Sequence, residues 1–241
     1  MSNNLGRYRS KLEKDFYIRR KKIINSQKAN FIADNPFLFA TRQEISDMLV
    51  RVKLFEIIKD IPGYIIECGS NNGNHLMLFY LMSAVLEPYS VNRKIISFDT
   101  FDGFRSISKV DGKISKKNFS KRNLKLIKEI VKVNDINRPL GHIDKVDFVI
   151  GDAVKTIPNW LKKNQETTIA MLYIDFDIYK PTYSALKHLT KLVSKGGVIV
   201  FDEINYSKFS GETKAIKDIF NINKIRLKKF NFHPFVGYTV I

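Results

Sequence analysis

The chain has 241 residues, of which 44% are apolar and 27% charged, and its formal net charge at pH 7 is +17. That length and composition indicate a globular protein with a core of its own and exclude a disordered chain. No apolar run approaches the ~20 residues that cross a bilayer, and the basic N-terminus lacks the apolar segment of a signal peptide, so we expect no membrane span and a cytoplasmic location.

The positive charge is concentrated in two segments. One is the run Arg19–Lys22, and the other is a series of lysines and arginines from Lys109 to Lys132. Such blocks occur on ordinary solvated surfaces, and they also attract anionic partners such as nucleic acids, phosphorylated substrates or acidic membranes. Charge alone therefore leaves the class of partner open.

Residues 1–60 have the pattern of a polar, basic helical segment, which we expect to form a cap or lid. Pro36 predicts a break near residues 34–36, because proline disfavours helix in the residue before it. Apolar residues at helical spacing predict a second helix over 42–59. From residue 61 the pattern changes, and residues 61–241 are expected to form the main domain.

This domain alternates short apolar strands with helices, which is typical of a mainly parallel α/β sheet. The last two predicted strands, 224–230 and 235–241, are joined by so few residues that they must be antiparallel. Seven strands in this chain order, after N-terminal helices, resemble the Rossmann-like fold of class I methyltransferases. The five core strands are expected at 64–66, 95–98, 146–150, 169–174 and 198–201, with helices at 74–87, 119–134, 154–164, 180–193 and 212–220.

Every predicted core strand ends in an acidic residue, although the chain as a whole is strongly basic. Open α/β sheets bind ligands beyond the carboxyl ends of their strands, so these acids are expected to surround a ligand. In strand order they are Glu67, Asp99, Asp152, the pair Asp175 and Asp177, and the pair Asp202 and Glu203.

The first strand end continues into a loop with glycines at 69 and 73, which allow a tight turn and a close approach to a ligand. The helix start that follows favours a carboxylate or phosphate. The spacing is not that of a dinucleotide fingerprint. Asp99 could hold a ribose diol and Asp152 could accept a hydrogen bond from an adenine amino group, or each could simply cap the next segment.

The fourth and fifth strand ends suggest a metal site. Asp175, Asp202 and Glu203 would meet there, and carboxylates so close together repel unless a cation or protons intervene. Oxygen ligands without a Cys/His cluster suit Mg²⁺ or Mn²⁺ rather than zinc. Such an ion could lower the pKa of a substrate hydroxyl. The alternative is that Asp202 and Glu203 only cap a loop.

Four segments together resemble the macrocin O-methyltransferase family, over a region of about residues 42–220. They are Ile65–Gly69, Ser97–Phe104, Ile174–Thr182 and Gly196–Glu203. The resemblance implies an S-adenosylmethionine-dependent enzyme that methylates a sugar hydroxyl, usually with Mg²⁺. It implies Asp175, Asp202 and Glu203 as metal ligands. The residues expected to bind the cofactor are Glu67, Gly69, Ser70, Asn71, Gly73, Asp99, Thr100, Asp152 and Ala153.

Two departures from that family stand out. Glu203 occupies a position where the family more often has aspartate. The segment 151–158 is closer to catechol-type metal-dependent O-methyltransferases, but Ile178 stands where those enzymes place a lysine. The general base is expected to be His233, if the sixth strand runs parallel to the core, and Asp175 or Asp177 could also take the proton. His75 is expected to contact the cofactor.

The sequence also allows three alternatives: a catechol-type small-molecule methyltransferase, an RNA methyltransferase, and a non-catalytic anion-binding module. No nucleic-acid-binding motif is visible, so we do not expect a nucleic-acid partner. We expect the sugar to be nucleotide-linked or part of a surface polysaccharide. A pyrophosphate would be held by basic residues of one of the two basic segments, and the candidates to be tested are Lys116, Lys117, Lys121 and Arg122 of the second. Family resemblance also implies a homo-oligomer.

Overall fold

The computed structural model describes residues 10–120 and 122–241, and the chain divides into two compact units, Met1–Asp47 and Met48–Ile241. The division lies inside a helix, α4 (Arg42–Ile58), whereas the boundary expected from the sequence follows that helix. Residues 1–9 of the expected cap and Lys121 of the basic segment lie outside the described residues. The other helices of the first unit are α1 (Lys11–Asn25), α2 (Ala29–Asp34) and α3 (Pro36–Phe39).

Capping side chains and a proline set the starts of two helices in the first unit. The Ser10 side chain accepts the N–H of Glu13, and the Glu13 carboxylate accepts the N–H of Ser10, so a capping box starts α1. Pro36 occupies the first turn of α3, where its missing N–H is not needed. The break predicted at residues 34–36 is therefore the junction of α2 and α3.

The second unit is built on a seven-stranded sheet with the order β3-β2-β1-β4-β5-β7-β6. The first five strands are parallel, β7 is antiparallel to β5, and β6 is antiparallel to β7. The predicted class I methyltransferase fold is thereby confirmed. The strands are β1 (Tyr64–Cys68), β2 (Ile95–Asp99), β3 (Val146–Ile150), β4 (Ile169–Ile174), β5 (Val193–Phe201), β6 (Lys228–Lys229) and β7 (Gly237–Val240).

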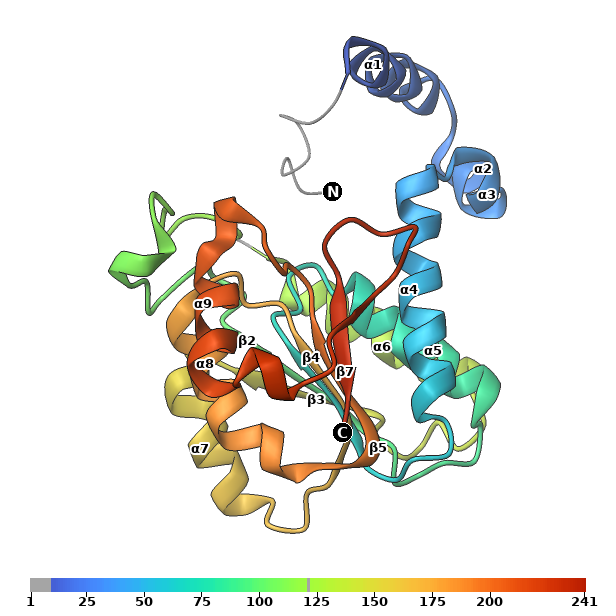
Figure 1. Ribbon diagram of the computed structural model, residues 1–241. Helices are drawn as coiled ribbons and strands as arrows, with labels where there is room; N and C mark the ends of the chain where they lie inside the picture. The colour runs from blue at the N-terminus through green and yellow to red at the C-terminus, as the bar shows by residue number, and fades with distance from the viewer. Residues whose placement is uncertain (1–9, 121) are drawn as a thin grey trace. The chain divides into compact units, whose positions relative to one another are not determined.

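Helices cover both faces of this sheet (Figure 1). On one face the residues of α4 from Val50 onward pack with α5 and α6, and on the other face α7, α8 and α9 pack on the opposite side chains of the same strands. None of the helices in the described ranges is both long and apolar enough to cross a membrane. The helices of this unit are α5 (Asn74–Leu86), α6 (Leu124–Asn137), α7 (Ala153–Lys163), α8 (Tyr179–Leu189) and α9 (Ser210–Ile219), with short 3-10 helices η2 (Lys109–Asp111), η3 (Thr190–Leu192), η4 (Ser207–Phe209) and η5 (Ile222–Lys224).

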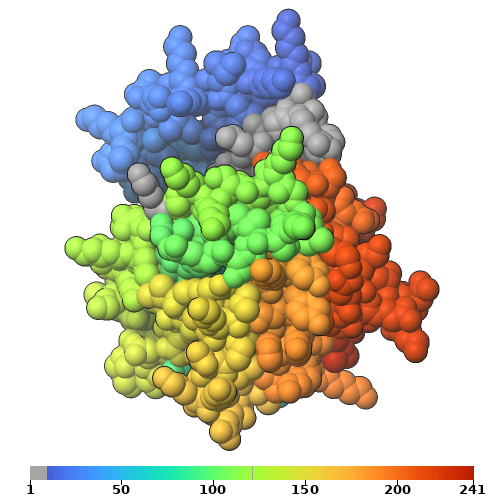
Figure 2. Space-filling view, turned by 90° about the vertical axis from the view of Figure 1, so that its left-hand side faces the viewer, coloured from blue at the N-terminus to red at the C-terminus, as the bar shows by residue number. Residues whose placement is uncertain are grey.

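The basic segment after β2 forms a closed loop. The N–H of Arg122 donates to the carbonyl of Phe101 at 3.2 Å, so the ends of the loop meet. Inside it, the buried Asp111 accepts the N–H of Tyr179, the first residue of α8, at 2.7 Å. In Figure 2 the green surface of this loop accordingly lies beside the orange surface of α8. Asp111 thus fastens the basic loop to the segment that follows β4.

Candidate functional site

The next-to-last residue of β1, Glu67, has a buried carboxyl group. Glu67 is fully buried, and the Ser70 hydroxyl donates a hydrogen bond to its Oε2 atom. The Oε1 atom has no hydrogen-bond partner among the residues that the structure describes. Burial raises the pKa of Glu67 from 4.5 to about 8, although the Ser70 hydroxyl opposes that rise. A buried acceptor without a partner suits a donor group of a ligand, such as an ammonium.

The turn after β1 requires glycine at position 69. Gly69 has a φ of +101°, and a Cβ at this position would lie 2.0 Å from the carbonyl oxygen of Asp175. No side chain fits in that space, and positive φ is itself costly for other residues. The glycine turn therefore lies directly against the end of β4.

Asp99, at the end of β2, holds the same turn. Its Oδ2 atom accepts the N–H groups of Ser70 at 2.8 Å and of Asn71 at 2.9 Å, and its Oδ1 atom accepts the N–H of Phe101 at 2.7 Å. A carboxylate offers about four acceptor positions, so these three bonds orient Asp99 and leave capacity for a ligand hydroxyl. The geometry is compatible with the predicted role on a ribose.

Thr100, Asp152 and Ala153 make the contacts of turns and helix caps. The Thr100 hydroxyl donates to the carbonyl three residues later at 2.6 Å. Asp152 caps α7, where its Oδ1 atom accepts the N–H two residues later at 3.1 Å and its Oδ2 atom accepts the Ser106 hydroxyl. Ala153 is buried in the first turn of α7. Their cofactor contacts stay predictions.

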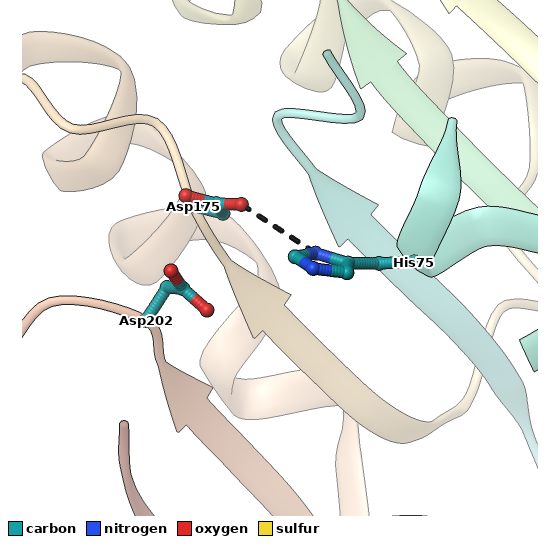
Figure 3. A group of neighbouring side chains, drawn as sticks. All are labelled: His75, Asp175 and Asp202. Atoms are coloured by element: carbon teal, nitrogen blue, oxygen red, sulfur yellow. Dashed lines mark ion pairs between the residues drawn. The ribbon is translucent and has the colours of Figure 1, made fainter. Parts of the chain in front are cut away.

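Two aspartates and one histidine converge at the ends of neighbouring elements (Figure 3). Asp175 follows β4, Asp202 follows β5, and His75 is the second residue of α5. One ligand atom from each lies within 4.8 Å of the others, and His75 Nδ1 is 3.7 Å from Asp175 Oδ2. Burial and the nearby Asp202 carboxylate raise the pKa of Asp175. A cation placed among these groups would relieve the repulsion between the two carboxylates.

A buried arginine lies beside this group. Arg51 of α4 donates from NH2 to Asp202 Oδ1 at 2.9 Å and contacts His75 Nδ1 at 3.3 Å. Its guanidinium also lies over the ring of Tyr173, 5.2 Å from the ring centroid, and the Tyr173 hydroxyl donates to the same Asp202 oxygen. Arg51 and Tyr173 therefore orient Asp202 through Oδ1 alone.

The third predicted metal ligand, Glu203, is not part of the group with Asp175 and Asp202. Its carboxyl is hydrogen-bonded to Asp177, and its backbone N–H donates to Glu212 Oε1 at 3.1 Å. Burial and the neighbouring acids raise the pKa of Asp177 to about 7 and that of Glu203 to about 11. As a metal ligand, Glu203 would have to exchange its hydrogen bond to Asp177 for a contact with the ion.

His233 lies where the sequence places it, in the loop that follows a strand parallel to the core. Its Nδ1 atom accepts the N–H groups of Val236 at 3.2 Å and Phe235 at 3.5 Å. A neutral ring that accepts at Nδ1 carries its proton on Nε2. In this tautomer Nδ1 accepts backbone N–H groups of the loop that contains His233. The role of His233 as general base stays a prediction.

Sequence reasoning overlooked two buried charged residues near the site, Arg51 and Glu212. Arg51 shares a helix face with Leu54 and Ile58, three and seven residues later, so helical periodicity could have indicated a buried cation. Glu212 lies within a predicted helix, where no local pattern distinguishes it. Only the packing of α9 against the residues after β5 brings it to Glu203.

Comparisons with known proteins identify the family of this chain. The model of a family described as macrocin-O-methyltransferase matches residues 20–231. Demethyldecarbamoylnovobiocin O-methyltransferase of Streptomyces niveus is 27% identical over 151 residues, which make up 60% of this chain and 53% of that enzyme. The match thus spans about half the length of that curated relative.

Solved structures extend the likeness over nearly the whole chain. The crystal structure of a calicheamicin methyltransferase superposes with a TM-score of 0.90 at 29% identity, covering 96% of this chain and 93% of that one. An apo structure described as a TDP-rhamnose 3'-O-methyltransferase of calicheamicin biosynthesis gives 0.84 at 28% identity, over 96% and 95%. The O-methyltransferase NovP, at 18% identity with a TM-score of 0.63 over 81% and 79%, shares the fold.

Proposed function

The chain belongs to the macrocin-O-methyltransferase family, and we propose that it transfers the methyl group of S-adenosylmethionine to a hydroxyl of a nucleotide-linked sugar, with the help of a divalent metal ion. The observation that carries this proposal is the family match over residues 20–231, together with acids at all five core strand ends. The 29% identity to a calicheamicin methyltransferase, and the TDP-rhamnose specificity stated for the second structure, support a sugar substrate.

The residues at the end of β1 fit S-adenosylmethionine. Glu67 Oε1 is a buried acceptor without a partner, and the cofactor carries an ammonium group that could donate to it. The glycine turn at 69 brings the backbone close to that carboxyl, and Asp99 retains acceptor capacity for a ribose hydroxyl. Ser70, Asn71 and Gly73 are carried by the same turn, and we assign them to the cofactor site as well.

Asp175 and Asp202 fit a divalent cation, because two carboxylates meet there and Asp202 Oδ2 accepts no hydrogen bond from the residues that the structure describes. A bound Mg²⁺ or Mn²⁺ would polarise the substrate hydroxyl and favour its loss of a proton. Arg51 and Tyr173 would keep Asp202 oriented throughout. Asp177, whose pKa is about 7, could accept a proton at neutral pH.

The basic loop after β2 supports the nucleotide-linked form of the substrate. Lys113, Lys116 and Lys117 are exposed on it, and Asp111 fastens it to the start of α8, just after the Asp175 segment. Lysines there could neutralise a pyrophosphate. A sugar of a surface polysaccharide would offer no such anion. The homo-oligomeric state and cytoplasmic location expected from the sequence remain predictions.

The direct test incubates the protein with S-adenosylmethionine and either dTDP-rhamnose or free rhamnose. Methyl transfer is measured as the release of S-adenosylhomocysteine and by mass spectrometry of the sugar. We expect transfer to the dTDP form, its loss with excess chelator, and its return with Mn²⁺ or Mg²⁺. Full turnover in chelator would contradict the metal, and equal turnover of free sugar would contradict the role of the basic loop. Generic RNA serves as the competing acceptor, and its methylation would favour an RNA methyltransferase.

A further inference from the structure

The metal site proposed above has two aspartates, and the structure indicates a third ligand that the sequence did not. His75 is the side chain that shares the space with Asp175 and Asp202 (Figure 3). It projects from the first turn of α5, directly after the glycine turn, so the same backbone geometry that forms the cofactor loop also places this imidazole. Its side chain is 25% exposed, and that of Asp175 is 19% exposed, so solvent ions can reach both.

The nitrogen of His75 that faces Asp175 is Nδ1, which lies 3.7 Å from Asp175 Oδ2. Arg51 NH2 lies 3.3 Å from His75 Nδ1, and a guanidinium can only donate. A neutral His75 that accepts from this guanidinium at Nδ1 carries its ring proton on Nε2. In this tautomer Nδ1 has the lone pair through which a neutral imidazole binds a metal ion.

Glu203, by contrast, stands outside this group. The group of ligand atoms that lie within 4.8 Å of one another does not include Glu203, and its carboxyl is hydrogen-bonded to Asp177. Recruiting Glu203 would require its carboxyl to leave Asp177 and turn toward Asp175 and Asp202. His75 already has a ring nitrogen within 4.8 Å of ligand atoms of Asp175 and Asp202.

We propose that His75 Nδ1, rather than Glu203, completes the metal site with Asp175 and Asp202, and that the site consequently prefers Mn²⁺ or Co²⁺ over Mg²⁺. This inference rests on the metal requirement proposed above. Mg²⁺ favours oxygen ligands only, whereas imidazole nitrogen suits the transition metals that follow Mn²⁺ in the Irving–Williams order. One nitrogen in the ligand set therefore shifts the selectivity of the site.

The experiment uses the full chain, stripped of metal with a chelator, and titrates Co²⁺, Mn²⁺ and Mg²⁺ separately by calorimetry. The visible absorption spectrum of bound Co²⁺ reports on a nitrogen ligand independently of turnover. The variants are His75→Ala and His75→Asp, and the control is His142→Ala, whose exposed imidazole lies just before β3. Thermal unfolding without metal checks that each variant is folded.

We expect wild type and His142→Ala to bind Mn²⁺ at least about tenfold more tightly than Mg²⁺. His75→Ala should lose about tenfold or more in Co²⁺ affinity, with a changed Co²⁺ spectrum. His75→Asp, with an oxygen in place of the nitrogen, should lose most of the preference for Mn²⁺ over Mg²⁺. An unchanged Co²⁺ spectrum and affinity in His75→Ala would overturn the inference, as would equal binding of Mg²⁺ and Mn²⁺ by the wild type.

The experiment distinguishes an error in the assignment of His75 from an error in the proposed function. If a metal binds and supports methyl transfer but His75→Ala leaves its affinity and spectrum unchanged, the inference is wrong and the metal-dependent reaction stands. If no divalent ion binds and methyl transfer proceeds in chelator, both the metal requirement and the inference are wrong. In that case the guanidinium of Arg51 is the positive charge that balances Asp202.

Discussion

Replacement of Glu67 by glutamine should make the protein more stable at neutral and mildly alkaline pH. The carboxyl is fully buried, and burial raises its pKa from the ordinary value of 4.5 to about 8 in the folded chain. Below pH 4.5 the group is protonated in the folded and unfolded chains, so it adds no pH dependence. Between pH 4.5 and about 8 the folded chain keeps a proton that the unfolded chain releases.

The free energy of unfolding therefore falls as the pH rises through this interval, by about 1.4 kcal/mol per pH unit for this one group. Over the interval from 4.5 to about 8, the loss amounts to about 5 kcal/mol. Glutamine cannot titrate, so the variant lacks this loss. The other buried acids titrate in both proteins, and their contributions cancel in the difference between variant and wild type.

The assay is urea unfolding of wild type and Glu67→Gln at pH 5, 6, 7 and 8, followed by circular dichroism. The difference in unfolding free energy should grow in favour of the variant by about 1.4 kcal/mol per pH unit. Glu56→Gln, which changes an exposed glutamate on α4, is the control for formal charge. The variant should also bind S-adenosylmethionine more weakly by about 1–3 kcal/mol. A stability difference that does not change with pH would refute the buried titration, and unchanged cofactor affinity would remove Glu67 from the cofactor site.

Three further substitutions test the other parts of the site. Asp99→Ala should weaken S-adenosylmethionine binding by about 1–3 kcal/mol in calorimetry, because its carboxylate organises the glycine turn and would contact the ribose; equal affinity would contradict this role. Asp175→Asn should reduce kcat by about a hundredfold or more and leave cofactor affinity nearly unchanged, and the reverse pattern would place Asp175 in the cofactor site. Neutral replacement of Lys116 and Lys117 should raise KM for a nucleotide sugar but not for S-adenosylmethionine, and an unchanged KM would leave these lysines as a solvated surface.

Much of the fold could be predicted because its determinants are local. Alternating apolar strands and helices require a parallel sheet, and a short connection before the last strand requires an antiparallel pair. Once the strands are parallel, their carboxyl ends meet at one edge, so a list of the residues that end them already collects Glu67, Asp99, Asp175 and Asp202. Gly69 could also be predicted, because a turn that passes against another backbone admits no side chain.

The partners of these acids could not be predicted, because they depend on which helix face packs against the sheet and on how each side chain turns. α4 packs so that Arg51 reaches Asp202 across 151 residues of sequence. Adjacent residues also have different surroundings, because Asp202 lies with His75 and Asp175, whereas the carboxyl of Glu203 is hydrogen-bonded to Asp177. Sequence places backbone positions at an edge of the sheet, whereas only the packed structure determines which charges are close enough to share a cation or a proton, since those energies change steeply over a few ångströms.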